Sequence, residues 1–219
     1  SAKHSKALAY MDYAAWQPGC FVVITGEIGA GKTILMKRLL RKLDKKVVCL
    51  NLPFTNLAGK ELLHFISMQA SLEVNSESKV SMIFALKKFF QEIKNNGLPC
   101  VLIIDEAQAM PRETIEALRL LTNMETEKRK LLQVVLFGQP ELDALLNRTD
   151  LRQLKQRIVF SEYLRPFSVA GAKAYIQHRL SFAGVDQPLF SAMALWLLAK
   201  GSRGIPRLLN VMAHKSLML

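Results

Sequence analysis

The stretch FVVITGEIGAGKTILMKRLL, from Phe21 to Leu40, decides the fold. Its first residues form a continuous apolar run, which is typical of a strand buried on both faces of a parallel sheet. The next eight residues, Gly26–Thr33, match the pattern G-x-x-x-x-G-K-S/T. Glycines let the backbone approach a ligand closely, and successive N–H groups at a helix N-terminus surround an anion. We therefore predict a triphosphate-binding loop, followed by a helix that begins near Lys32.

The pattern assigns roles to individual side chains of this loop. We expect Lys32 to reach the β and γ phosphates of ATP and the Thr33 hydroxyl to ligate Mg²⁺. An ordinary glycine-rich turn is the alternative, and the right order of all eight positions between a strand and a helix argues against it. The residues predicted to bind the nucleotide are Gly26, Glu27, Ile28, Gly29, Ala30, Gly31, Lys32, Thr33 and Ile34.

A second motif, VLIIDEAQ, closes the apolar strand predicted at 100–104 with Asp105 and Glu106. Ligands of parallel sheets bind beyond the carboxyl ends of the strands, so we expect Asp105 to converge with the loop and hold Mg²⁺ through its water shell. Glu106 is expected to polarise the attacking water as a general base or an orienting group. The alternative is a surface acidic pair, which the matching loop disfavours. An Asp-Glu pair favours hydrolysis over transfer to a small acceptor, and the chain has no room for the second domain of a helicase.

A third candidate is Gln139, which follows the strand predicted at 131–137. We expect that strand to lie between the first and third strands of the sheet. A polar side chain at its end can contact both the γ-phosphate and the attacking water. The alternative is a loop residue that starts the turn with Pro140.

Strands alternate with helices through residue 164, which predicts an α/β fold with helices on both faces of a parallel sheet. From Ser168 onward the pattern is only helical, which predicts an α/β domain over 1–167 and a small helical domain over 168–219. The predicted strands are 21–24, 47–52, 100–104, 131–137 and 158–164. The predicted helices are 5–16, 32–43, 57–71, 78–95, 111–127, a pair in 141–156, 169–183, 191–200 and 206–218.

The composition of the chain restricts the classes of protein to which it can belong. The 219 residues are 50% hydrophobic and include no apolar run long enough to span a bilayer, and no signal peptide pattern opens the chain. The chain lacks an initiating Met, which is consistent with a fragment of a longer protein, and any membrane or targeting segment of that protein would lie outside this sequence. The net charge of +12 suits phosphate-bearing, acidic or membrane partners, with a solvated basic surface as the alternative. Cys20, Cys49 and Cys100 have no metal-ligand spacing and indicate a reducing compartment.

These motifs together resemble the Walker A loop and Walker B strand of an AAA+ ATPase. Longer phrases are similar to the ExeA/GspA/MshM group, the ATPases associated with type II secretion and type IV pilus systems, including MSHA-type pilus biogenesis. Regulatory ATPases of some transposons share much of the pattern. The phrases are TGEIGAGKT, IIDEAQAMPRETIEALRLLTNMET, LLQVVLFGQPELDALL, LRQLKQRI, YLRPFS, AYIQHRLSFAG and GIPRLLN.

The resemblance implies a P-loop three-layer α/β/α sheet with strand order 5-1-4-3-2 and a helical lid. It also implies a ring or arc with ATP at subunit interfaces, in which Mg²⁺-dependent ATP hydrolysis drives assembly of a secretin or pilus apparatus. The expected partners are inner-membrane components, at the cytoplasmic face of the inner membrane of a Gram-negative bacterium. Larger members add a transmembrane segment and a peptidoglycan-binding domain. Neither is present in this sequence, which puts direct cell-wall binding by this chain in doubt.

Two alternatives remain beside this function. A DNA-associated regulator of the transposition type fits the charge of +12, although no helix-turn-helix element can be assigned. An assembly scaffold that binds ATP and barely hydrolyses it is the other.

The resemblance also carries over two arginines as catalytic residues, beside Lys32, Glu106 and Gln139. Arg157 in KQRI precedes the last strand, where AAA+ proteins place the arginine finger that reaches a neighbour's γ-phosphate. A surface salt bridge is the alternative, and Arg148 and Arg152 compete for the role. Arg207 in GIPR begins a lid helix at the sensor 2 position, which implies a contact with the nucleotide of its own subunit. The alternative for Arg207 is a generic phosphate-facing or solvent-exposed arginine.

Overall fold

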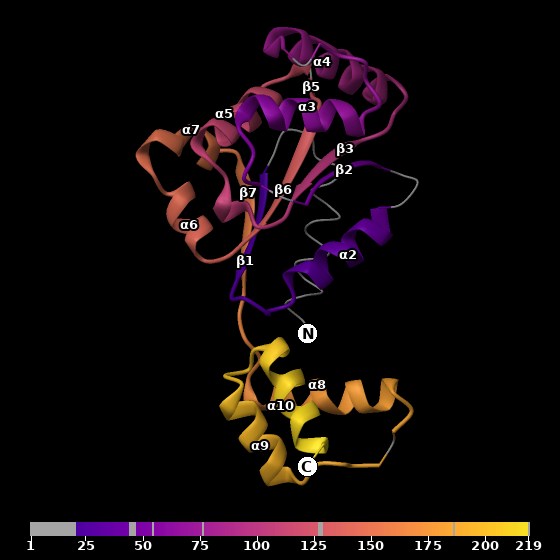
Figure 1. The fold of residues 1–219 in the computed structure, drawn as a ribbon, viewed down its shortest axis with the longest axis vertical. Helices are drawn as coiled ribbons and strands as arrows, with labels where there is room; N and C mark the ends of the chain where they lie inside the picture. Colours follow the sequence, from indigo (N-terminus) through magenta and orange to yellow (C-terminus); the bar gives the residue numbers. More distant parts are fainter. Residues whose placement is uncertain are drawn as a thin grey trace. The chain divides into compact units, whose positions relative to one another are not determined.

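A computed structural model of the chain describes residues 21–43, 47–53, 55–75, 77–126, 129–185 and 187–218 (Figure 1). The helix predicted over 5–16 lies outside these residues. The chain divides into two compact units. The smaller unit holds Gly26–Lys32 together with the residues from Leu164 onward, and the larger unit holds Thr33–Tyr163 and the strand residues up to Thr25.

A five-stranded sheet lies at the centre of the larger unit, in the order β2-β3-β6-β1-β7. The pairs β2/β3, β3/β6 and β6/β1 are parallel. Counted along the chain, these strands are 2-3-4-1-5, so the predicted order 5-1-4-3-2 is confirmed. Their bounds are β1 (Phe21–Gly26), β2 (Val48–Leu52), β3 (Cys100–Ile104), β6 (Leu132–Gly138) and β7 (Ile158–Leu164).

Helices fill the connections between these strands, as expected for parallel pairing. Helix α2 (Lys32–Leu43) has the predicted bounds, and the helices predicted at 57–71 and 78–95 are shorter at their ends. The remaining helices of this unit are α3 (Gly59–Gln69), α4 (Lys79–Asn95), the 3-10 helix η1 (Ala107–Ala109), α5 (Arg112–Thr122), α6 (Glu141–Leu146), the 3-10 helix η2 (Thr149–Leu151) and α7 (Arg152–Lys155).

The prediction that the helix after Pro111 continues to about residue 127 is wrong. Helix α5 ends at Thr122, and the antiparallel strands β4 (Glu125–Thr126) and β5 (Arg129–Lys130) follow it. Residues 125–130 contain no apolar side chain, so a helix there would have no face to bury.

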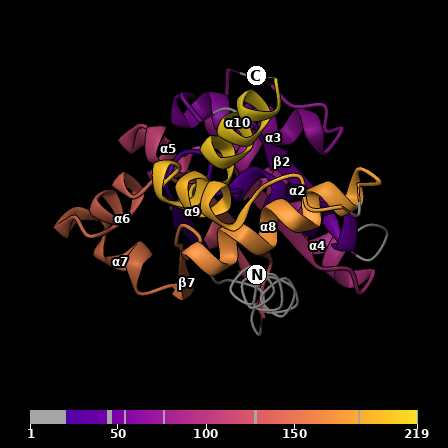
Figure 2. The same ribbon diagram turned by 90° about the horizontal axis from the view of Figure 1, so that it is seen from below.

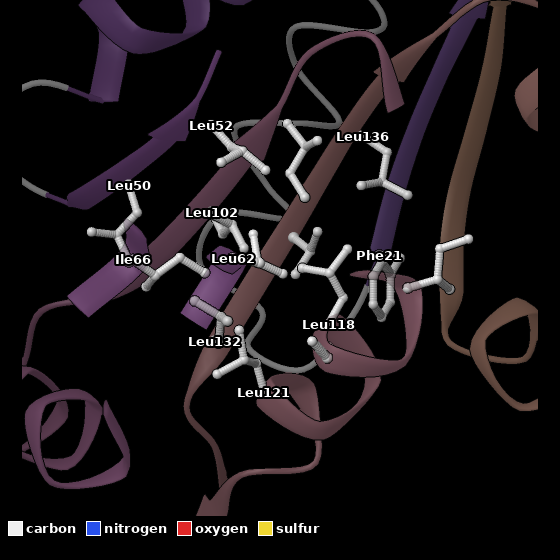
Figure 3. Close-up of a cluster of buried hydrophobic side chains, with 14 of the residues drawn as sticks. Phe21, Leu50, Leu52, Leu62, Ile66, Leu102, Leu118, Leu121, Leu132 and Leu136 are labelled. Atoms are coloured by element: carbon white, nitrogen blue, oxygen red, sulfur yellow. The ribbon is translucent and has the colours of Figure 1, made fainter. Parts of the chain in front are cut away.

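The strands β1, β3 and β6 are buried on both faces, which explains their continuous apolar runs. Alternate strand residues, such as Phe21, Leu102 and Leu132, join one cluster with Leu62 of α3 and Leu118 of α5 (Figure 3). The strand residues between them are equally buried and belong to the opposite face. Helix α2 contributes the buried side chains Leu35, Met36, Leu39 and Leu43. The fold is therefore the predicted α/β fold with helices on both faces.

The described residues of the smaller unit form three helices (Figure 2), whose buried side chains make up a separate core. Ser168 and Ser191 cap two of them, because each hydroxyl oxygen accepts a hydrogen bond from a backbone N–H of the first turn. In the chain as described, no helix is both long and apolar enough to cross a membrane. The helices are α8 (Val169–Phe182), α9 (Ala192–Gly201) and α10 (Pro206–Leu217).

Candidate active site

The predicted phosphate loop encloses the side chain of Lys32. The ammonium Nζ donates to the carbonyl oxygens of Gly26 at 2.7 Å and Glu27 at 3.2 Å, and the side chain is 6% exposed. Gly29 and Gly31 have positive φ angles of 83° and 100°, a region that favours glycine. The loop therefore holds a buried cation beside its own backbone.

Arg207 lies directly against this loop, within the smaller unit. Its backbone N–H donates to the carbonyl oxygen of Gly29 at 3.3 Å. A Cβ built on Gly29 would lie 2.6 Å from the Cβ of Arg207 and 3.3 Å from Cγ2 of Ile205. The Arg207 side chain is exposed, and no carboxylate within the described ranges forms an ion pair with it. The structure thus brings the predicted sensor 2 arginine to the predicted phosphate loop.

Two predicted nucleotide-binding side chains, Ile28 and Ile34, are exposed, by 60% and 70%. Glu27 is exposed as well. Ala30 is buried, and its N–H donates to the carbonyl oxygen of Glu27 at 3.0 Å, which tightens the loop.

Thr33 and Asp105 face one another in the larger unit. The Thr33 hydroxyl donates to Oδ2 of Asp105 at 3.4 Å, and Oδ1 of Asp105 accepts from the backbone N–H of Glu106 at 3.0 Å. A hydroxyl and a carboxylate are ligands that Mg²⁺ prefers, so this pair fits the predicted metal. Among the described residues, no group of three or more His, Cys, Asp or Glu could hold a metal.

Glu106 and Gln139 come from the carboxyl ends of neighbouring strands and form a hydrogen bond. Oε2 of Glu106 accepts from Nε2 of Gln139 at 3.2 Å and from Nε2 of Gln108 at 2.7 Å. The Thr55 hydroxyl, 3% exposed, donates to the backbone oxygen of Glu106 at 2.9 Å. Glu106 itself has a left-handed backbone, with φ 51° and ψ 39°. The two residues predicted to act on the attacking water therefore lie together.

Sequence reasoning missed Gln108 and Thr55. Gln108 stands two positions after Glu106 in VLIIDEAQ, and this closeness along the chain is a signal that could have indicated its contact with Glu106. Nothing in the sequence around Thr55 indicates its contact, because the two residues meet only across neighbouring strands.

Arg157 lies at the amino end of the edge strand β7, whereas Glu106 and Gln139 lie at the carboxyl ends of β3 and β6. It precedes β7, and its carbonyl oxygen accepts from the N–H of Phe21, the first residue of β1, at 2.9 Å. Its guanidinium Nη1 donates to the Thr122 hydroxyl at 3.3 Å, and the residue is half-buried. Within the larger unit, the structure therefore does not bring Arg157 to Glu106 and Gln139.

The two competing arginines differ from Arg157. Arg148 donates from Nε and Nη2 to the two carboxylate oxygens of Asp150, each at 3.2 Å, while Arg152 is exposed. Partial burial raises the pKa of the Asp150 carboxyl. The hydrogen bond and charge of Arg148, together with the charge of Arg112, lower it by more, so the pKa lies below its ordinary value. Arg148 is thus engaged within its own chain.

Comparison with known proteins identifies the family. Residues 17–146 match the sequence model of a family described as an AAA domain, which is more than half of the chain. The chain belongs to this family. General secretion pathway protein A of Aeromonas hydrophila is 38% identical over 221 residues, a match that covers 100% of this AAA domain chain and 40% of that protein. The chain therefore spans about 40% of that relative's length, and the resemblance to the ExeA/GspA group is confirmed.

Solved structures share the fold of this AAA domain chain. The ORC2 protein of Aeropyrum pernix in its ADP form has a TM-score of 0.66 and 15% identity, over 95% of this chain and 60% of that one. The Holliday junction branch migration motor RuvB of Thermotoga maritima has a TM-score of 0.58 and 20% identity, over 95% and 57%. At these identities the likeness shows the fold alone, and the predicted P-loop AAA+ fold is confirmed.

Proposed function

We propose that this AAA domain binds ATP with Mg²⁺ and hydrolyses it to ADP and phosphate. One observation carries the proposal: two carboxylates at the end of β3 face different partners. Asp105 accepts from Thr33, the residue that follows Lys32, and Glu106 accepts from the amide of Gln139 at the end of β6. The first arrangement suits a metal and the second suits a water molecule.

The side chains divide the reaction among them. The loop and Lys32 would bind the phosphates. Thr33 and Asp105 would hold Mg²⁺, which would offset the negative charge of the phosphates. Glu106 accepts the proton of the attacking water as the water oxygen bonds to the γ-phosphorus. The bond from that phosphorus to the bridging oxygen breaks, and ADP leaves with the electron pair. Gln139 orients the water beside Glu106.

Turnover by a ring or arc of subunits completes the proposal. An arginine from the neighbouring subunit, Arg157 or the exposed Arg152, would offset charge on the γ-phosphate. Arg207 would contact the nucleotide of its own subunit and carry the state of the site to the lid helices. Its position against Gly29 supports this role.

The biological role that we propose is assembly of a secretion or pilus apparatus at the cytoplasmic face of the inner membrane, together with inner-membrane components. The support is the 38% identity to a protein named for the general secretion pathway. The net charge of +12 keeps a DNA-associated regulator as the second candidate. DNA binding that survives physiological salt would favour that candidate, because non-specific binding weakens steeply with salt.

The experiment compares ATP affinity and phosphate release for the wild type, Lys32→Met and the control Lys37→Met. Lys32→Met removes an ammonium held inside the loop, so we expect ATP affinity to fall by about 10- to 100-fold and turnover to stop. Lys37 is exposed on the same helix, so its variant is expected to match the wild type. Unchanged affinity in Lys32→Met would contradict the nucleotide site. Normal secretion or pilus assembly by the full-length protein with Lys32→Met would contradict the biological role.

A further inference from the structure

We propose that Gln108 is a positioning residue for Glu106, and that its side-chain amide links the Glu106 carboxylate at the end of β3 to the backbone of Gln139 at the end of β6. The inference rests on the proposed function, because it concerns the residue that takes the proton from water. It adds a residue that acts through Glu106 and does not itself contact the reacting atoms.

Both ends of the Gln108 amide are engaged. Nε2 donates to Oε2 of Glu106 at 2.7 Å, and Oε1 accepts from the backbone N–H of Gln139 at 3.0 Å. A side-chain amide donates from nitrogen and accepts at oxygen at the same time, whereas a carboxylate only accepts and an ammonium only donates. Turning the amide over would set its oxygen against the carboxylate and its nitrogen against an N–H. The two partners therefore fix a single orientation of Gln108.

The same carboxylate oxygen also accepts from the side chain of Gln139, at 3.2 Å. Gln108 thus positions Glu106 in two ways: it donates to the carboxylate directly, and it holds the backbone of the second residue that donates there. Two donors that converge on Oε2 restrict rotation of the carboxylate about the Cγ–Cδ bond of Glu106. Such restriction matters for a general base, because a misplacement of about 1 Å can cost about 100-fold in rate.

Hydrogen bonds also hold the backbone of Glu106. Its left-handed conformation, φ 51°, is unfavourable for a residue with a Cβ and persists where surrounding contacts determine it. The Glu106 carbonyl oxygen accepts from the Thr55 hydroxyl at 2.9 Å and from the N–H of Ala109 at 3.0 Å. The second contact belongs to η1, which also presents the Gln108 side chain.

Gly138 makes room for this link. A Cβ built on Gly138 would lie 3.1 Å from Oε1 of Gln108 and 2.6 Å from Cδ2 of Leu142. A side chain at the last residue of β6 would therefore push against the amide oxygen that receives the Gln139 N–H.

The test is a set of variants in the full chain, with ATP affinity, kcat and thermal unfolding measured for each. Gln108→Met keeps the length of the side chain and removes both hydrogen bonds. We expect kcat to fall by about 10- to 100-fold with ATP affinity unchanged. Gln108→Glu keeps the acceptor and loses the donor, so it is expected to lose a comparable amount. The control Gln156→Met changes an exposed glutamine and is expected to match the wild type.

A double variant separates positioning from a merely structural role. If Gln108 acts through Glu106, adding Gln108→Met to Glu106→Gln lowers the residual single-turnover rate by less than about twofold. Equal losses in both backgrounds, or a fall in ATP affinity and melting temperature along with kcat, would overturn the inference. So would wild-type kcat in Gln108→Met. Absence of phosphate release by the wild type itself would instead contradict the proposed function, and this inference with it.

Discussion

Gly29 has to be glycine for two reasons, its backbone conformation and the lack of space for a side chain. Its φ of 83° lies in the region that favours glycine, and the space a side chain would occupy is filled by Arg207 and Ile205. The motif pattern includes this position in the nucleotide-binding loop but does not require glycine there, because the position is one of its variable ones. The second requirement depends on a helix far along the chain, so the sequence alone does not reveal it.

A pair of variants separates the two requirements. Gly184 has a φ of 80°, and nothing lies within 4 Å of the Cβ it would carry. Gly184→Ala therefore reports the conformational cost alone. We expect Gly29→Ala to lower the free energy of unfolding by about 1–3 kcal/mol more than Gly184→Ala does, because it also clashes with Arg207. Denaturant unfolding of both variants measures this difference, and equal losses would show that the loop does not pack on Arg207.

At the scale of the elements, the sequence predicted the central strands well because each is an apolar run with a clear end. Strands β3 and β7 have the predicted bounds, and Glu106 and Gln139 lie together as predicted, since parallel strands end at one edge of the sheet. The contact of Gln108 with the Gln139 N–H was not predictable. It depends on the register that pairs Ile104 with Leu136, and no local pattern encodes that register.

The burial of strand β3 inside the sheet can be tested through the reactivity of Cys100. Cys100 is its first residue and is 2% exposed, and burial raises the pKa of its thiol to about 12, with the neighbouring Cys49 adding to the shift. In the variant with Cys20→Ser and Cys49→Ser, we expect alkylation of Cys100 at pH 8 to be at least about 100-fold slower in the folded protein than in denaturant, since the thiolate is the reactive form. The matched variant that keeps only the half-buried Cys49 is expected to react faster.

The same shift has a defined sign for stability. The folded state keeps the Cys100 proton between the unfolded pKa of 9.0 and the folded pKa of about 12. The free energy of unfolding therefore falls as pH rises through this window, and the stabilising contribution is complete below it.

For the alkylation experiment, equal rates in the folded and denatured protein would show that Cys100 is not buried in the sheet.

At the scale of the whole molecule, the phosphate loop Gly26–Lys32 and the lid helices belong to one compact unit, while Thr33, Asp105 and Glu106 belong to the other. The end of the strand–helix alternation predicted a change of architecture near residue 168. It did not predict that the phosphate loop belongs to the same compact unit as the lid helices, because that depends on contacts such as the one between Gly29 and Arg207. The residue that would serve as the proposed arginine finger was the least predictable from the sequence. Arg157 is half-buried beside Thr122, and the residue that a neighbouring subunit would meet depends on the assembly.

Phosphate release by Glu106→Gln, set beside its ATP affinity, tests the central claim most directly. The substitution keeps the size of the side chain and leaves Lys32, Thr33 and Asp105 unchanged, so we expect ATP affinity within about threefold of the wild type. A neutral amide cannot take the proton of the attacking water, so we expect kcat to fall by about 100- to 10,000-fold. Wild-type turnover in a folded Glu106→Gln protein would contradict the account, because the reaction would not need the carboxylate at the end of β3.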